Sequence, residues 1–523
     1  MLKQGCYWHR CDCKADNLKN ASQEEIDKRH DLDKKKLEYL QKLGYRVIVK
    51  KECEWKHQKT IDPSIMTQVQ RAMKFKYQGE AWKKQLGTEP KKDILRLVKT
   101  GELFGLLKIS IEIQDEKLLR RCQEFPPFFK HVEISRADIG PHMQEFANQT
   151  DTLKKPQKAL VSSLFAKEWW CASPLLQFYL NLGCTVTEIH EVVQWTPIRC
   201  FERFVNNIVN ARREADKDPL KKIIGEQEKL TGNSAPGRSL MRTDRFVTTT
   251  VVSKDVAQRA VNNPHFKDYC QLDNNLFELR MRHKFVQARM PSQIGLMVYG
   301  WAKRFLLEMY YDFIDKYISR GRFGLVLCDT DSLYFGLGAS SLREAVNPDL
   351  RLQFDLELPK WMPTDLCKDH YDERQRRRER GEEGTEDVFG PLPYCCYQSF
   401  AHQRRTLGLW KVECQSDAIV ALAAKAYNCY NVTQPENPEE DDNLTFETVK
   451  LSCKGVQKCN PMTANAYRSV LHSTKSHYAV NRGIRLSHLK QMCTYKQQKK
   501  SLSYLYVKRQ VLDDGVSTIP LKL

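Results

Sequence analysis

The sequence predicts a protein of the α+β class, in which strands and helices are mixed but do not alternate strictly. Two observations support this class. Residues 102–115, ELFGLLKISIEIQD, alternate apolar and polar side chains as a half-buried strand does. Residues 291–318 carry apolar side chains at helical spacing and lead directly into 325–337, LVLCDTDSLYFGL, which is typical of two strands joined by a tight turn.

The composition points to a folded protein with an anionic partner. The chain has 523 residues, of which 41% are hydrophobic and 10% aromatic, which excludes a disordered chain. Lys and Arg number 84 against 65 Asp and Glu, so the formal charge is +19. Nucleic acid is the commonest partner of such a chain, and a membrane surface or simple solubility is the alternative.

The sequence contains neither a long apolar run nor the apolar core of a signal peptide, so we expect an intracellular protein without a membrane partner. Its 18 cysteines are then buried thiols or metal ligands and not a disulfide framework. Residues 45–50, YRVIVK, are expected to form a strand after a helix and a turn at Gly44. Helical spacing occurs in 159–166, 173–183 and 200–216. Two charge-dense segments, 372–387 and 434–443, are expected to be exposed loops.

Two aspartates, Asp329 and Asp331, lie one residue apart at the tip of the expected hairpin. Carboxylates this close repel one another and resist joint ionisation unless a cation lies between them. Oxygen ligands of this kind favour Mg²⁺ or Mn²⁺. The alternative is an Asp-rich turn that binds no metal.

A second motif, KLTGNSAPGRS, begins at Lys229. The preceding residues are expected to be helical, so Lys229, Asn233 and Ser234 share one helix face until Gly232 and Pro236 disturb the helix. A lysine beside small residues suits a triphosphate, because it supplies a point charge where the backbone can approach closely. The alternative is a solvated lysine near a helix end.

Together these stretches resemble the motifs of family B DNA polymerases. KLTGNSAPG is similar to the fingers motif K-x-x-x-N-S-x-Y-G, and CDTDSLYF is similar to the palm motif Y-x-D-T-D-S. AAKAYNCY presents Lys425 and Tyr427 like the K-x-Y motif that follows the palm, and Lys454 lies near where template-primer is gripped. The match extends over about residues 100–523. It is greatest to protein-primed polymerases of mobile elements and linear plasmids, especially those related to Maverick-type transposons.

This resemblance implies a right-hand polymerase with palm, fingers and thumb that acts as a DNA-directed DNA polymerase. Asp329 and Asp331 are then expected to hold the Mg²⁺ (or Mn²⁺) ions that align the primer 3′-hydroxyl with the α-phosphate of a deoxynucleoside triphosphate. Lys229 is expected to bind that triphosphate, with Asn233 and Ser234 shaping the pocket.

The same resemblance assigns Lys425, Tyr427 and Lys454 to the DNA template-primer, and it places Tyr334 and Phe335 in the packing of the palm. A terminal priming protein is a further expected partner. A nuclear location follows from the implied DNA substrate.

The chain departs from the family's pattern at the first palm strand. The family has a third metal-binding aspartate there, and this sequence has Ser110 in its place, with Lys108 in place of a glutamate. Glu112 shares the strand face and Asp115 lies at the strand's end, so these two are the candidate replacements.

Two lesser departures are Pro236, at the aromatic position of the fingers motif, and Leu327, in place of the tyrosine before DTDS. The alternative function is therefore a catalytically impaired, DNA-binding remnant of a transposon polymerase.

The N-terminal stretch GCYWHRCDC gathers cysteines at a spacing that suits a tetrahedral zinc site, and reduced free thiols are the alternative. It resembles the very-short-patch repair endonucleases. That resemblance implies that Cys6, Cys11, Cys13 and Cys53 bind structural zinc and that His9 is the catalytic histidine. It also implies a truncated, restriction-endonuclease-like α/β unit that belongs to a longer protein, because the metal-binding aspartate of that fold lies upstream of Met1.

The expected domains follow from these assignments. In chain order they are an endonuclease-like zinc unit at 1–60, a linker at 61–98, the first part of the palm with inserted helices at 99–210, fingers and connector at 211–290, the palm hairpin at 291–345, and the rest of the palm with the thumb at 346–523.

Overall fold

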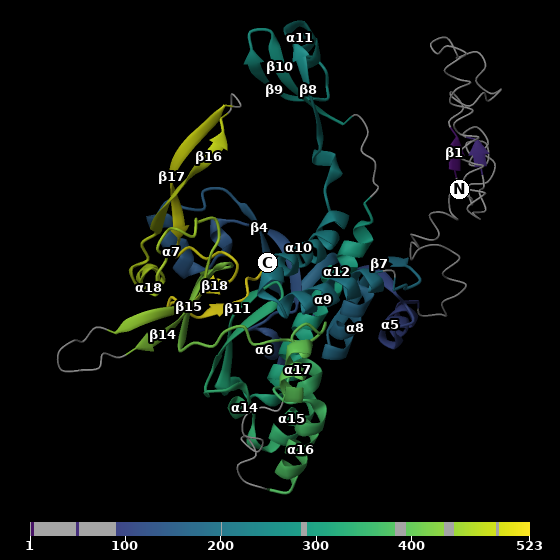
Figure 1. Ribbon diagram of the computed structural model, residues 1–523, viewed down its shortest axis with the longest axis vertical. Coiled ribbons are helices and arrows are strands. Elements are labelled where there is room, and N and C mark those ends of the chain that lie inside the picture. Colours follow the sequence, from purple (N-terminus) through teal and green to yellow (C-terminus); the bar gives the residue numbers. More distant parts are fainter. Residues whose placement is uncertain are drawn as a thin grey trace. The chain divides into compact units, whose positions relative to one another are not determined.

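The computed structural model describes residues 2–4, 49–51, 90–199, 201–283, 290–381, 394–433, 444–487 and 491–523. Helices and strands are mixed along the chain, as Figure 1 shows, so the predicted α+β class is confirmed. The chain divides into two compact units, formed by Met1–Pro90 with His190–Thr196 and by Lys91–Ile189 with Pro197–Leu523.

In the first unit, β1 (Leu2–Gln4) pairs in parallel with β2 (Val49–Lys51). The second strand overlaps the end of the strand expected at 45–50. The rest of that prediction, and the N-terminal cysteines with His9, lie outside the described residues.

The second unit begins with α5 (Pro90–Thr100), and a three-stranded sheet follows in the order β6-β3-β7, of which β7 belongs to this unit as far as Ile189. Its central strand β3 (Gly105–Glu112) lies within the segment expected to be a strand, and Leu107, Ile109 and Ile111 point to its buried face. The antiparallel partner β6 (Phe165–Ala172) occupies one edge and β7 (Thr185–Gln194) the other. Helix α8 (Ser173–Leu182), which was expected, packs on β3 and β6.

The helix expected at 159–166 is wrong. This segment forms the end of β5 (Gln157–Ser163) and the start of β6, and β5 pairs antiparallel with β4 (Phe128–Ile134) along its whole length. Burial alternates near the end of β5, where Val161 and Ser163 are inward. In so short an apolar run, the alternating pattern of a strand cannot be distinguished from the spacing of apolar residues in a helix. Pairing with β4 stabilises the strand here.

Two helices, α9 (Glu202–Asp216) and α10 (Lys222–Ser239), pack against each other. A Cβ atom on Gly225 would lie 3.1 Å from Cβ of Ala215, so the glycine permits this close approach. The predicted disturbance by Gly232 and Pro236 is wrong, because α10 continues through both residues. Pro236 removes one N–H donor near the end of the helix, and packing of α10 on α9 and α12 offsets that loss.

The long helix expected at 291–318 is confirmed in three consecutive pieces. These are α12 (Ser292–Glu308), a wider π-helical turn η5 (Met309–Ile314) and α13 (Asp315–Tyr317). A Cβ atom on Gly300 would lie 2.5 Å from Cβ of Ala172, so α12 depends on this glycine for its approach to β6. The wider turn buries Tyr310 and Tyr311 almost completely.

The predicted hairpin follows as β11 (Phe323–Asp329) and β12 (Ser332–Leu337). The Glu124 carboxylate, which follows helix α6 (Glu116–Cys122), fixes where β11 begins. Its Oε1 accepts the backbone N–H of Leu325 at 2.7 Å, and its Oε2 lies 2.6 Å from the Arg320 guanidinium and accepts the hydroxyl of Tyr310. Phe335 on β12 stacks on Tyr310, which agrees with its expected packing role.

A helical segment follows the hairpin. It contains α14 (Leu342–Ala345), α15 (Arg351–Trp361), α16 (Lys368–Glu379) and α17 (Tyr394–Gln403). The loop expected at 372–387 is wrong for residues 372–379, which lie in α16. Their charges pair within the helix, since Glu373 lies 3.2 Å from both Arg376 and Arg377. The loop expected at 434–443 lies outside the described residues.

The C-terminal region is built on a sheet of β13 (Ala418–Ala423), β14 (Ala426–Thr433) and β15 (Thr445–Cys453), with α18 (Ala464–Ser473) packed on it. Two hairpins follow, β16 (His477–Leu486) with β17 (Met492–Leu502) and β18 (Gln510–Val511) with β19 (Thr518–Ile519).

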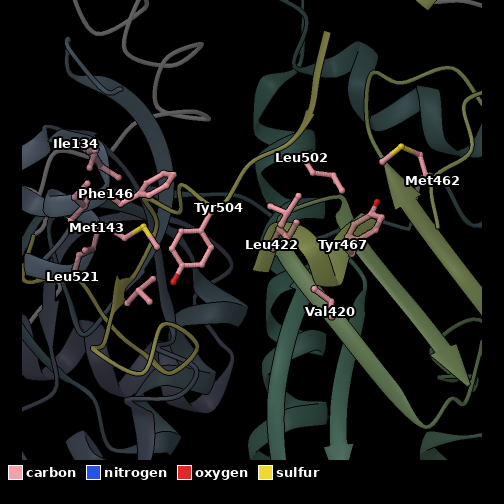
Figure 2. Packing of buried hydrophobic residues seen from close by; sticks show 14 of the residues in the cluster. Ile134, Met143, Phe146, Val420, Leu422, Met462, Tyr467, Leu502, Tyr504 and Leu521 are labelled. Carbon is pink, nitrogen blue, oxygen red and sulfur yellow. The ribbon is translucent and has the colours of Figure 1, made fainter. Parts of the chain in front are cut away.

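One hydrophobic cluster joins this region to residues far away in the chain, as Figure 2 shows. Met143 and Phe146 from α7 (Pro141–Gln149) share it with Tyr504 and Leu521. Val420, Leu422 and Tyr467 belong to the same cluster. The C-terminal residues are therefore part of the same core as α7, which lies in the chain between β3 and β6.

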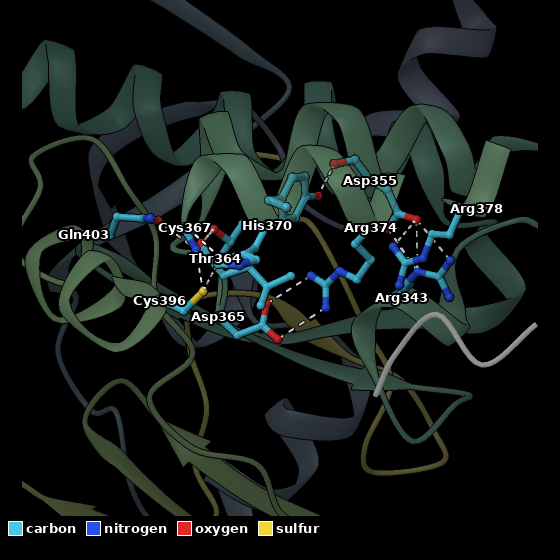
Figure 3. Close-up of polar contacts among 12 residues, drawn as sticks. Arg343, Asp355, Thr364, Asp365, Cys367, His370, Arg374, Arg378, Cys396 and Gln403 are labelled. Carbon is cyan, nitrogen blue, oxygen red and sulfur yellow. Dashed lines mark hydrogen bonds and ion pairs between the residues drawn. The ribbon is translucent and has the colours of Figure 1, made fainter. Parts of the chain in front are cut away.

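A buried charge holds the helical segment together. Asp355 on α15 is only 2% exposed, and its carboxylate accepts hydrogen bonds of 3.0 Å from Arg343 and 2.9 Å from Arg378 (Figure 3). We predict that Asp355→Ala lowers the stability by about 3 kcal/mol, because two guanidinium groups lose their counter-charge. The apparent unfolding temperature in scanning calorimetry measures this. Asp349→Ala, an exposed aspartate beside α15, is the matched control and should leave that temperature unchanged.

Candidate functional site

The DTDS hairpin turns in only two residues, Thr330 and Asp331. Asp329 pairs with Ser332 across the turn, and the N–H of Asp331 donates to the carbonyl of Asp329 at 2.7 Å. Thr330 has a φ of 58°, which is uncommon for a β-branched residue and costs energy. The tip is thus held in a conformation that presents Asp331 to solvent, while the side chain of Asp329 is 18% exposed.

A lysine from a distant turn binds this tip. Lys425 lies in the turn between β13 and β14, and its Nζ is 2.8 Å from both Oδ1 and Oδ2 of Asp329. Lys425 also has a positive φ, of 61°. Two strained turns therefore meet, and the ammonium group of one neutralises a carboxylate of the other.

The neighbouring tyrosines fix this contact. The hydroxyls of Tyr427 on β14 and Tyr334 on β12 are 2.8 Å apart, and their ring centroids are 4.9 Å apart. Burial, and then the hydrogen bond with Tyr334, raise the pKa of Tyr427 well above its ordinary value. Tyr427 is 6% exposed, so in this structure it contacts the hairpin and not solvent. Lys450 Nζ lies 5.3 Å from the centroid of the Tyr334 ring.

Lys454 is exposed and lies next to Lys425, since its N–H donates to the Lys425 carbonyl at 3.1 Å. It belongs to a stretch with a pronounced charge bias. From Thr448 to Leu512 the sequence has 13 Lys and Arg residues and no Asp or Glu. Most of the excess positive charge of the protein is therefore in the region that contributes Lys454 and the β16–β17 hairpin.

The structure gives Ser110 and its neighbours other partners. The Ser110 hydroxyl accepts the N–H of Glu168 at 3.2 Å, and Lys108 forms an ion pair of 2.6 Å with the Glu168 carboxylate. Glu112 accepts a hydrogen bond of 2.8 Å from Gln114, and Asp115 caps α6 by accepting the N–H of Leu118. Within the described ranges, neither Asp329 nor Asp331 belongs to a group of three potential metal ligands.

Lys229, Asn233 and Ser234 all lie on α10 and are exposed. The Ser234 hydroxyl donates to the carbonyl of Thr231 at 3.1 Å. Among the residues that the structure describes, no hydrogen bond or ion pair connects these three to Asp329 or Asp331. Their predicted role in triphosphate binding therefore stays a prediction.

A cluster of metal-ligand side chains lies elsewhere, at the start of α16 and α17. It consists of Cys367, His370, Cys395 and Cys396, whose ligand atoms all lie within 4.8 Å of one another. His370 Nδ1 is 3.0 Å from Sγ of Cys367, 3.5 Å from Sγ of Cys395 and 3.3 Å from Sγ of Cys396. Figure 3 shows three of these residues converging. We refer to the four as the Cys3His cluster, which could hold a metal such as zinc.

The thiols of the cluster differ in their affinity for protons. A backbone hydrogen bond at His370, together with hydrogen bonds to neighbouring side chains, lowers the pKa of Cys367 to about 7. Burial raises the pKa of Cys396 to about 11. Cys367 is therefore the first of these two thiols to ionise.

Our sequence interpretation missed this cluster and favoured the N-terminal cysteines instead. The signal was a C-x-x-H pair at 367–370 followed by adjacent cysteines at 395–396. The loop expected at 372–387 lies between the two pairs in the chain, and its first residues lie in α16 in the structure.

Comparisons with known proteins identify no relative. No family model matches this chain, and neither the curated proteins nor the solved structures contain a match. Within the described ranges, no helix is both long enough and apolar enough to cross a bilayer.

The Asp329–Lys425 contact makes a testable prediction about metal affinity. Lys425→Ala should tighten Mn²⁺ binding about fivefold, because a partly exposed ion pair contributes about 1 kcal/mol that the metal no longer has to overcome. Titration followed by electron paramagnetic resonance of free Mn²⁺ measures this. Asp329→Asn should weaken binding, and Lys454→Ala is the matched lysine control. Equal Mn²⁺ affinity in all four proteins would exclude the hairpin as a metal site.

Proposed function

We propose that this protein is a DNA-directed DNA polymerase of the family B type, with the DTDS hairpin as its catalytic centre. The observation that carries this proposal is the contact of Lys425 with Asp329. The family resemblance assigns Lys425 to the DNA template-primer and Asp329 to the metal site, and the Lys425 ammonium group lies 2.8 Å from the Asp329 carboxylate.

In this proposal Asp329 and Asp331 hold Mg²⁺ or Mn²⁺. The oxygen donors fit a hard divalent cation, and the contact of Lys425 with both oxygens of Asp329 marks a position where a positive charge is favourable. When bound, the metal would activate the primer hydroxyl and neutralise charge on the phosphates. Lys425 would orient the Asp329 carboxylate before the metal binds.

Lys425 and Lys454 also suit contact with the DNA backbone. Their turns are connected by the hydrogen bond from the Lys454 N–H to the Lys425 carbonyl, and both side chains are exposed to solvent. The stretch 448–512, which lacks acidic residues, would extend this contact along the duplex, since phosphate neutralisation supplies most of the non-specific affinity for DNA. Tyr427 acts by positioning the hairpin through Tyr334.

The remaining roles follow from the family resemblance. Lys229, with Asn233 and Ser234, would receive the deoxynucleoside triphosphate on α10. A terminal priming protein would supply the first hydroxyl, and a nuclear location would follow from the DNA substrate.

A second candidate function is favoured by the surroundings of Ser110. Its hydroxyl is engaged with Glu168, and the structure assigns neither Glu112 nor Asp115 to the hairpin. Two carboxylates without a third hold two metal ions poorly. A catalytically impaired polymerase remnant that still binds DNA is therefore the alternative.

Primer extension distinguishes the two candidates. We predict that the protein extends a primer slowly with Mn²⁺, that Asp331→Asn abolishes extension, and that Ser110→Asp increases it about a hundredfold by supplying several kcal/mol of charge stabilisation. The assay measures deoxynucleotide incorporation on a primed DNA template.

Asp273→Asn, at the tip of the β9–β10 hairpin (Phe266–Asp273 with Leu276–Arg282), is the matched control and should leave extension unchanged. Extension by Ser110→Asp alone would identify the impaired remnant. If all the proteins fail to extend the primer but still bind DNA, the polymerase proposal is wrong.

DNA binding makes a separate prediction. Lys454→Ala and Lys496→Ala should each weaken binding of a fluorescent duplex and reduce the slope of log affinity against log salt by about 0.9, the value for one lost phosphate contact. Fluorescence anisotropy at several salt concentrations measures both quantities. Lys254→Ala, an exposed lysine on α11 (Lys254–Val261), is the matched control and should leave the slope unchanged.

A further inference from the structure

We propose that the Cys3His cluster binds one structural Zn²⁺ through three thiolates and one imidazole. This site is independent of the proposed polymerase centre, and its residues come from two helices separated in the chain. Cys367 immediately precedes α16 and His370 lies in its first turn, while Cys395 and Cys396 lie in the first turn of α17.

The distances fit a tetrahedral centre. With Zn–S bonds of about 2.3 Å and a Zn–N bond of about 2.0 Å, tetrahedral geometry gives sulfur–sulfur edges of about 3.8 Å and sulfur–nitrogen edges of about 3.5 Å. The Sγ atoms of Cys367 and Cys395 are 3.9 Å apart. The three distances from His370 Nδ1 are 3.0, 3.5 and 3.3 Å. Four ligand atoms are thus arranged around a space of the size that one zinc ion needs.

The surroundings suit thiolate ligands. The N-termini of α16 and α17 both carry partial positive charge, which favours anions at this point. The backbone N–H of Cys367 donates to Sγ of Cys396 at 3.3 Å, a hydrogen bond that stabilises a thiolate ligand and orients it. On binding, Zn²⁺ replaces the thiol protons, which pass to solvent, and His370 binds through the neutral ring nitrogen Nδ1.

A metal would also stabilise the packing of α16 and α17. Among the described residues, the buried apolar cluster here consists of Leu366, Tyr371 and Cys396, with Cys367 packed against it. Helix α16 is composed mostly of charged residues and has little apolar surface to bury. Small cores of this kind usually depend on a metal or a disulfide for stability.

A disulfide is the competing explanation, and the geometry favours zinc. A disulfide needs two sulfur atoms about 2.05 Å apart. Cys367 and Cys395 are at nearly twice that distance, and the imidazole of His370 lies within reach of all three thiols. An imidazole nitrogen close to all three sulfur atoms is expected of a metal site, in which it is the fourth ligand, whereas a disulfide does not need it.

The site would tie α17 to α16, and α17 leads to contacts with α9. Arg405, just after α17, forms a two-pronged ion pair with Asp216 at the end of α9, with both distances 2.6 Å. Thr406 accepts a hydrogen bond of 3.3 Å from Arg213. Removal of zinc should therefore loosen the base of the α9–α10 pair as well as the helical segment.

The test is the zinc content of the full chain. The double variant Cys367→Ser/Cys395→Ser removes two ligands while serine remains a good residue at the start of α16. Mass spectrometric metal analysis after mild chelation should show one zinc fewer per chain than the parent protein. Any zinc on the N-terminal cysteines is common to both proteins and cancels in this difference.

Two further variants test whether zinc is lost because ligands are removed or because the protein fails to fold. Cys395→His keeps a nitrogen ligand and should retain the zinc, and Cys459→Ser, an exposed cysteine elsewhere, should match the parent. Replacement of zinc by Co²⁺ should give thiolate-to-metal absorption in the parent that the double variant lacks. Equal zinc in the parent and the double variant, or a disulfide among the cluster's cysteines found by peptide mapping, would overturn the proposal.

Discussion

The placement of the DTDS hairpin depends on one carboxylate, that of Glu124. It accepts a backbone N–H of β11 and lies against Arg320 and Tyr310, so it joins the start of the hairpin to the wide helical turn that precedes it. Arg320 and Arg121 also share Asp315, whose side chain is 6% exposed. Because these groups are partly buried, loss of Glu124 would leave the backbone N–H of Leu325 without its acceptor and would remove one of the two carboxylates that pair with Arg320. This network fixes the first residues of the strand that carries Asp329. Because the strand is held there, the hairpin tip can keep Thr330 at its unfavourable positive φ.

The tip of the hairpin and the β13–β14 turn have complementary properties. Each has a non-glycine residue at positive φ, and the two meet through Lys425 and Asp329. Strain of this kind persists only where the surroundings fix it, and here Glu124 fixes one side and the Tyr334–Tyr427 pair the other. If a metal binds at the hairpin as proposed, it would compete with the Lys425 ammonium group for Asp329. A phosphate of the proposed DNA partner that drew Lys425 away would then favour metal binding.

The sequence patterns correctly predicted the elements with strong local periodicity. They failed where contacts with residues far away in the chain determine the local structure. The strand at β3, the helices α8 and α9, the long helix before the hairpin and the hairpin itself all have strong local periodicity. The segment 159–166 has too few apolar residues to distinguish a helix from a strand, and the pairing of β5 with β4 settles it. The break expected at Pro236 does not occur, because packing of α10 on two other helices offsets the lost hydrogen bond. The charges at 372–379 form pairs within a helix and with buried Asp355, which no count of charge could reveal. The Cys3His cluster was missed for the same reason, since its two halves meet only when α16 and α17 are both in place.

The surroundings of Ser110 bear directly on how the proposed site could have lost a carboxylate. The N–H of Glu168, which has a positive φ of 44°, donates to the Ser110 hydroxyl, and an aspartate at this position could accept the same hydrogen bond. Lys108 already neutralises the Glu168 side chain, so a new carboxylate would meet an N–H donor and a neighbouring pair with no net charge. The strand therefore retains a backbone geometry compatible with an aspartate at 110. In the proposed function, a serine at this position would therefore leave the site without a third carboxylate while the hairpin, the Lys425 contact and the basic surface stay as the structure has them.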